Sequence, residues 1–340
     1  MPAPSPDPVD APSLSERPGA DLLTEAGGEI EFDAVTADVT ADESRHQLEE
    51  RKLGIGFWVA TAWLVVLVLL AFLAPWLPFV QDPNEIDALA LRQPVAWQDG
   101  GSWNGSASDT LHLLGGDDLG RDIFSRVIWG ARVSLFVGVA AVALGFLIGG
   151  TIGLTAGYFR GQYEKIVMAA MDIMLAFPAL ILALAIVVFL SEPGSQEATL
   201  RTITLTLTIL SIPALARITR ASTLTFSQRE FVQAARTLGA RNGRILVREI
   251  LPNVIPPMVS FSLIAVAIVI VAEGALSFLG LSVSAPTATW GNMINEGRTA
   301  LEFAPHIALV PCAVMFLTLL SLNYVGDQLR RRFDVKEVRL

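Results

Sequence analysis

The amino-acid sequence predicts an all-α membrane protein with six transmembrane helices. Hydrophobic residues make up 52% of the 340-residue chain and charged residues only 17%. The mean hydropathy is +0.53. The apolar residues also form runs of about 20 residues, the length at which an α-helix crosses a bilayer. Together these observations exclude an ordinary soluble enzyme.

Hydropathy separates six apolar runs along the chain. The run at 202–218 alternates like a β-strand in its TITLTLTI repeat. A lone strand would leave its backbone groups unpaired in lipid, so we predict a helix whose threonines face neighbouring helices. The predicted spans are 57–80, 132–157, 166–190, 202–218, 254–276 and 304–325.

Acidic residues are concentrated in the first 50 positions. This stretch holds 13 Asp and Glu residues against Arg17 and Arg45, whereas the rest of the chain carries a net charge of +2. It is rich in Pro and Ala and too polar to form a core. We therefore expect a disordered acidic tail at 1–50 and a transmembrane domain at 51–340.

The distribution of Lys and Arg predicts the orientation. With the N-terminus inside, 16 basic residues lie on the cytoplasmic side and six outside. Cytoplasmic loops of membrane proteins carry such an excess. Both termini are therefore expected in the cytoplasm, and the loop at 81–131 is the main outward feature.

Two features within the spans suggest packing or transport roles. Glycines recur every four residues in the second span, which places them on one helical ridge and favours close helix packing. Asp172 and Glu273 are ionisable residues in apolar runs; each lines a substrate path or pairs with a neighbouring helix. The ridge consists of Gly145, Gly149, Gly153 and Gly157.

Catalytic motifs are missing from the sequence. None of the three lysines follows a glycine, although a phosphate-binding loop needs a Gly-Lys pair. The single cysteine, Cys312, allows no thiolate metal cluster, and the three histidines lie in different regions. We therefore expect no catalytic site, no metal site and no cofactor on this chain. Any nucleotide would be hydrolysed by another chain.

A basic segment, FVQAARTLGARNGRILVREILPN, lies between the fourth and fifth spans, within 225–252. Gly239 permits a sharp turn, and Pro252 is expected to stop the helix before the fifth span. Ile245, Leu246, Ile250 and Leu251 are expected to form an apolar face that enters a partner's groove. A loop resting on anionic lipid headgroups is the alternative.

The same residues resemble the cytoplasmic signature of ATP-binding-cassette importer permeases. Gln233-Ala234-Ala235 is followed at the family's spacing by Gly239 and then by Leu251-Pro252. Gln233 replaces the usual glutamate, and Glu249 stands where isoleucine is usual. Residues 112–135, 273–294 and 323–335 are similar to C-type subunits of dipeptide and oligopeptide permeases.

The resemblance implies a type I importer permease fold in a bacterial inner membrane. It implies as partners a homologous second permease, two ATPases that bind ATP and Mg, an extracytoplasmic binding protein and membrane lipid, but no nucleic acid. The ATPase-docking coupling helix would comprise Gln233, Ala234, Ala235, Arg236, Leu238, Gly239, Ala240, Arg244, Ile245, Leu251 and Pro252.

Peptide import driven by the partner ATPases is the function that this resemblance implies. A related branch of the family moves nickel or other small solutes. An ion-coupled secondary transporter that uses Asp172 and Glu273 is a rival hypothesis, and a membrane anchor or sensor is another.

Overall fold

Long helices form the frame of the structure, a computed structural model that describes residues 54–102, 111–190, 196–283 and 286–337. The predicted tail at 1–50 lies outside these residues. The helices are α2 (Ile55–Leu73), η3 (Ala74–Trp76), η4 (Ala88–Ala90), α3 (Ile123–Phe159), α4 (Gly161–Ala176), α5 (Ala179–Leu190), α6 (Gln196–Phe226), α7 (Glu230–Thr237), α8 (Asn242–Arg244), η5 (Ile245–Ile250), α9 (Leu251–Phe278), α10 (Trp290–Gly297), η6 (Arg298–Ala300) and α11 (His306–Glu337).

The predicted all-α fold is confirmed for the described residues. Five helices, counting continuous neighbours together, are long and apolar enough to cross a membrane. The bent pair α4 and α5 brings the number to six if the pair forms one span.

The second span begins nine residues before the apolar run predicted at 132–157. Asp122 is the N-cap of α3, and its carboxylate accepts a hydrogen bond from the Ser125 amide at 2.8 Å. Such a cap satisfies one of the orphan amides of the first turn. Capping, which hydropathy does not report, therefore sets the start of α3.

The third span is not the straight helix that a single run at 166–190 suggests. α4 and α5 meet at a bend of 95°. Phe177 has an extended backbone, with ψ of 140°, because the ring of the following Pro178 disfavours the helical conformation in the residue before it. The prediction of one uninterrupted run missed this break.

The fourth span is a helix, as predicted, despite its alternating sequence. Thr202, Thr206 and Thr208 are buried. The hydroxyl group of Thr208 donates to the Thr204 carbonyl oxygen at 2.8 Å, one turn earlier in the same helix. Thr208 therefore satisfies its hydroxyl group within α6, whereas the Thr202 hydroxyl group donates to the Leu190 carbonyl oxygen of α5 at 3.4 Å.

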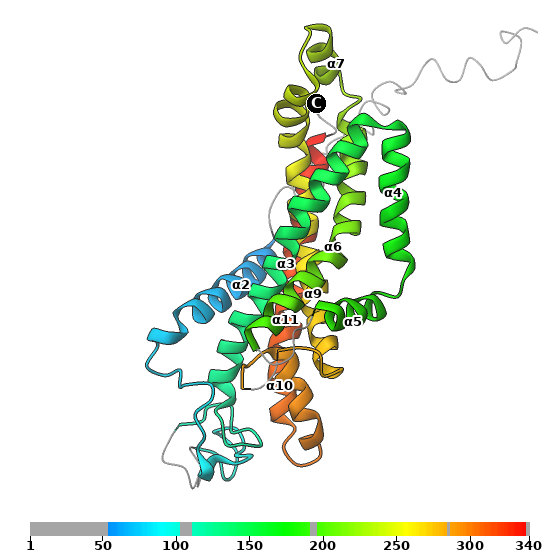
Figure 1. Cartoon of the computed structure of the whole chain (residues 1–340). Coiled ribbons are helices and arrows are strands. Elements are labelled where there is room, and N and C mark those ends of the chain that lie inside the picture. The colour runs from blue at the N-terminus through cyan, green and yellow to red at the C-terminus, as the bar shows by residue number, and fades with distance from the viewer. Residues whose placement is uncertain (1–53, 103–110, 191–195, 284–285, 338–340) are drawn as a thin grey trace, which may run out of the picture. The chain divides into compact units, whose positions relative to one another are not determined.

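Four helices run together along the described domain. α6 packs on α3, α9 on α11, and α9 also contacts both α3 and α6. Figure 1 shows these helices running together, with α7 at one end and α10 at the other. The two ends of this group of four helices therefore carry different elements, α7 at one end and α10 at the other.

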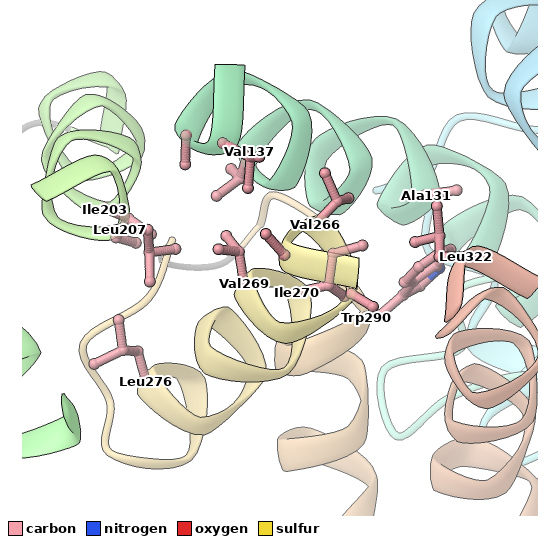
Figure 2. Close-up of a cluster of buried hydrophobic side chains, with 14 of the residues drawn as sticks. Ala131, Val137, Ile203, Leu207, Val266, Val269, Ile270, Leu276, Trp290 and Leu322 are labelled. Atoms are coloured by element: carbon pink, nitrogen blue, oxygen red, sulfur yellow. The ribbon is translucent and has the colours of Figure 1, made fainter. Parts of the chain in front are cut away.

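Buried apolar side chains fill the space between these helices. Figure 2 shows Ile203 and Leu207 of α6 and Val137 of α3 gathered around Val269 of α9. Trp290, at the start of α10, belongs to the same cluster and is fully buried. The cluster joins α10 to the packed helices.

The glycine ridge of the second span lies directly against α6. A Cβ atom added at Gly149 would lie 2.6 Å from the Ile212 carbonyl oxygen, and one at Gly157 would lie 2.9 Å from the Arg220 carbonyl oxygen. Real Cβ atoms do not come this close to a backbone atom. The two helices therefore pack backbone against backbone along the ridge, where only glycine fits.

We predict that Gly153→Ala destabilises the domain. The added Cβ would overlap the Ala216 carbonyl oxygen and would lie 2.7 Å from the Thr219 Cβ, so α3 and α6 would have to separate. Overpacking of this kind costs about 1–3 kcal/mol. Thermal unfolding of the purified chain measures the loss.

Gly54→Ala is the matched control, because a Cβ at Gly54 meets no atom within 4 Å. If Gly153→Ala and Gly54→Ala unfold at the same temperature as the unchanged chain, the ridge is not a close packing surface.

Candidate functional site

The segment at 225–252 folds as two short helices joined by a sharp turn. Glu230 lies in the first turn of α7 and Arg236 in its last turn, where their charges complement the helix dipole. Gly239 then adopts a φ of +78°, and its amide donates to the Arg236 carbonyl oxygen at 3.0 Å. The turn predicted at Gly239 is confirmed.

Side chains of α7 contact the end of α3. The guanidinium group of Arg236 lies 5.3 Å from the centre of the Tyr158 ring. The Tyr158 hydroxyl group donates to Asn242 Oδ1 at 2.9 Å. The Gln233 side-chain amide donates to the Gln228 carbonyl oxygen at 3.1 Å. These contacts hold α7 and α8 against α3 and the end of α6.

Exposure divides the eleven residues implied for docking into three groups. Ile245 alone is fully buried. Ala235, Ala240 and Leu251 are partly buried. The exposed residues are Gln233, Ala234, Arg236, Leu238, Gly239, Arg244 and Pro252. Leu238 is the most exposed apolar side chain among them, at 87%.

The expected apolar face at 245–251 is wrong as a partner surface. Ile245 and Ile250 are fully buried and Leu246 is 7% exposed. They pack in one cluster with Val232 of α7 and Met258 of α9. These residues therefore fix the segment to its own chain, and the opposite side of α7 stays exposed.

Pro252 does not stop the helix, contrary to the expectation from sequence. α8, the π-helical turn η5 and α9 form one continuous helix of 37 residues, Asn242–Phe278. The Leu251 amide donates to the Leu246 carbonyl oxygen, five residues back. Pro252 lies in the first turn of α9, where a missing N–H is tolerated, and the widened π turn before it accommodates the change in hydrogen bonding.

The two ionisable residues suggested for a substrate path have separate partners. Asp172 of α4 pairs with Arg217 of α6, and both side chains are more than half exposed. Glu273 of α9 is 1% exposed, and Ser282 Oγ donates to its carboxyl group at 2.7 Å. No hydrogen bond or ion pair joins Asp172 to Glu273 within the described residues.

A second group of charged residues, which we call the loop charge cluster, is absent from the predictions made from sequence. It comprises Asp87, His112, Asp117, Arg121, Asp122, Arg126 and Glu296. His112 is 1% exposed. Its Nδ1 lies 3.3 Å from Asp122 Oδ1, and its Nε2 lies 3.4 Å from Asp87 Oδ2. These carboxylates also cap α3 and η4. One imidazole ring therefore joins two helix caps that are far apart in the sequence.

The other half of the loop charge cluster reaches α10. Arg121 donates to Asp117 at 2.6 Å and to Glu296 at 2.9 Å. Arg126, which is 1% exposed, lies 3.4 Å from Glu296 and 3.6 Å from Asp117. The four-residue spacing of Asp117 and Arg121 was the available signal, but the partner on α10 lies 175 residues away.

No group of three or more His, Cys, Asp or Glu residues in the described part of the chain is arranged to hold a metal ion. The His112 ring instead makes hydrogen bonds with its two carboxylates. Those bonds, above all the one to Asp122, raise the pKa of His112 above its ordinary 6.5. Protonation therefore stabilises the contact.

Comparison with known proteins identifies the class. Residues 149–337 match the family model of the binding-protein-dependent transport system inner membrane component. Two solved inward-facing conformations of the MetNI methionine ABC transporter match with a TM-score of 0.51 and sequence identities of 17% and 16%. They cover 61% and 62% of this chain and 96% and 97% of those chains. At this identity the likeness shows the fold, that of a type I importer permease.

Curated relatives agree with the family match. The chain is 37% identical over 277 residues to the glutathione transport system permease protein GsiD of Pectobacterium atrosepticum, a match that covers 82% of this chain and 86% of the relative. The GsiD proteins of Escherichia coli and Shigella boydii match at the same identity and cover 85% of their length. The chain therefore belongs to the binding-protein-dependent transport system inner membrane components, the permeases of ATP-binding-cassette importers.

We predict that the loop charge cluster is more stable at acidic than at alkaline pH because of His112. A pKa raised in the folded state gives stability that is complete below the ordinary 6.5. This stability is lost as the pH rises through the raised value. Hydrogen exchange of the 111–122 amides, corrected for intrinsic rates, should show full protection below pH 6.5 and a protection that falls as the pH rises above that value.

His112→Gln should remove this dependence. His306→Gln is the control, because His306 lies beside Gly115 and makes no ion pair with a carboxylate in the described residues. A pH dependence that survives His112→Gln would contradict the assignment.

Proposed function

We propose that this chain is the channel-forming subunit of an ATP-driven importer for peptides of the dipeptide and oligopeptide class. One observation carries the proposal: an exposed, basic helical segment is fixed to the start of a continuous 37-residue helix. A partner that moves α7 would therefore move a membrane-spanning helix with it. The chain itself would catalyse no reaction.

The proposed partners follow from the family. A homologous second permease would complete the channel, and an extracytoplasmic binding protein would deliver the substrate. Two ATPases would bind ATP and Mg on the cytoplasmic side of a bacterial inner membrane. Both termini of this chain would lie on that side, as the excess of basic residues there supports.

The proposed docking surface is the exposed side of α7 and the turn after it. Leu238 offers an apolar anchor that is 87% exposed, and the same segment also exposes Gln233, Ala234 and Arg244. An amphipathic helix laid into a groove binds through such anchors. Buried Ile245 would act indirectly, by holding the segment to α9.

The substrate class rests on two supports. The matched relatives are named as glutathione transport permeases, and glutathione is a tripeptide. The resemblance to dipeptide and oligopeptide permeases points the same way. Secondary transport through Asp172 and Glu273 is less supported, because Arg217 neutralises the first and hydroxyl groups enclose the second.

Reconstitution of the whole transporter in proteoliposomes tests this function. We expect uptake of labelled glutathione or alanyl-alanine that requires ATP, both ATPases and the binding protein. Uptake by this chain alone under an ion gradient would contradict the proposal. Uptake of nickel without any peptide would contradict the substrate class.

We predict that Gly239→Val uncouples ATP hydrolysis from uptake. Gly239 has a φ of +78°, a conformation that β-branched residues strongly disfavour, so the turn would change shape. ATP hydrolysis should continue while uptake per ATP falls at least about tenfold, which corresponds to about 1.4 kcal/mol of coupling.

Gly243→Val is the matched control. Gly243 lies in the same segment, has no positive φ, and has no atom within 4 Å of an added Cβ. Uptake by Gly239→Val at the unchanged rate, or an equal loss in both variants, would show that this turn does not set the coupling.

A further inference from the structure

A buried carboxyl group lies near the far end of the continuous helix that begins at α8. Glu273 lies one turn before the end of α9 and is 1% exposed. Its carboxyl group accepts hydrogen bonds from Ser282 at 2.7 Å and from Ser277 at 3.3 Å. The Ser134 and Thr289 hydroxyl groups also interact with this carboxyl group. We call these five residues the Glu273 box.

Two of these hydroxyl groups also hold the first turn of α10. Ser134 Oγ accepts the Trp290 amide at 3.2 Å, and Thr289 Oγ1 accepts the Asn292 amide at 3.1 Å. A hydroxyl group carries one proton. Having accepted from an amide, each can donate that proton to Glu273. The Ser134 bond therefore ties α10 to α3, the Thr289 bond caps α10 itself, and both hydroxyl groups interact with the Glu273 carboxyl group of α9.

The contact between α9 and α10 is also close in its backbone. A Cβ atom added at Gly291 would lie 2.6 Å from Ser277 Oγ and 2.8 Å from the Gly274 Cα. The Trp290 indole N–H donates to the Val127 carbonyl oxygen of α3 at 3.1 Å. The start of α10 therefore cannot shift along α9 without breaking these contacts.

The last turn of α10 is tied to the loop charge cluster. Glu296 accepts from Arg121 at 2.9 Å and from Arg126 at 3.4 Å. α10 thus has Glu273 at one end and two arginines of the 112–126 region at the other. Figure 1 places α10 at the opposite end of the packed helices from α7.

We propose that Glu273 is a positioning residue that transmits movement between the coupling segment and the loop charge cluster, by fixing α10 to the end of α9. This inference rests on the proposed function. The connection runs from α7 through the continuous helix Asn242–Phe278 to the Glu273 box, and from there through α10 to Glu296 and the arginines. Docking of the binding protein at the outward end would reach the ATPases by the same route.

Glu273→Gln tests the inference in the complete transporter. A glutamine side chain has one acceptor oxygen and a donor NH₂ group where the carboxyl group has two acceptor oxygens, so the box loses acceptors with almost no change in volume. We expect basal ATP hydrolysis to remain. Its stimulation by the binding protein loaded with alanyl-alanine should fall about fivefold or more, the usual lower range of a coupling between two sites.

The readout is the ratio of stimulated to basal hydrolysis, which a general loss of folded protein does not change. Ser262→Ala is the matched control, because within the described residues the Ser262 hydroxyl group bonds to the Met258 carbonyl oxygen of its own helix and not to the Glu273 box. Ser282→Ala, which removes one donor from the box, should lower the ratio in the same direction by a smaller factor. If the transporter with Glu273→Gln does not assemble, the ratio measured for Ser282→Ala decides whether the inference holds.

An unchanged ratio in Glu273→Gln, or in Ser282→Ala where only that variant assembles, would overturn the inference. So would a proportional loss of basal and stimulated hydrolysis, which would mean a structural role alone. Failure of the proposed function is distinguishable, because the unchanged transporter would then show no stimulation by any loaded binding protein.

Discussion

The close contact between α3 and α6 is the constraint on which the rest of the structure depends. Along the glycine ridge the two helices approach so closely that a methyl group at Gly149 or Gly153 would meet backbone atoms of α6. In lipid, helices gain little from hydrophobic association, so such packing is a main source of attraction. α9 then packs against both helices, and its extension through η5 and α8 carries the exposed segment.

The continuous helix Asn242–Phe278 connects the packed spans to the exposed segment. α9 has no break at Pro252 because the π turn precedes it, so α8, which follows the proposed docking surface, and the buried Glu273 belong to one continuous helix. The apolar residues Ile245 and Ile250 hold α7 to this element from inside. A force applied at Leu238 therefore acts on the spans directly.

Local features of the structure could be predicted from sequence, and long-range ones could not. The glycine ridge and the Gly239 turn follow from spacing and from the conformational freedom of glycine. The hydropathy prediction does not include the bend at Phe177-Pro178, although its signal, a proline, is local. The burial of Ile245 and the pairing of Arg121 with Glu296 depend on partners brought together by the fold, 175 residues apart in the second case, and no periodicity reports them.

Cysteine cross-linking at Leu238 tests the central claim most directly, namely that α7 is the surface that a partner ATPase moves. The only native cysteine, Cys312, is first replaced with serine. In the complete transporter, Leu238→Cys should cross-link to an ATPase subunit with an efficiency that changes when ATP binds. Leu89→Cys, 62% exposed on η4, should not cross-link to it. No cross-link at Leu238, or one at Leu89 instead, would contradict the account.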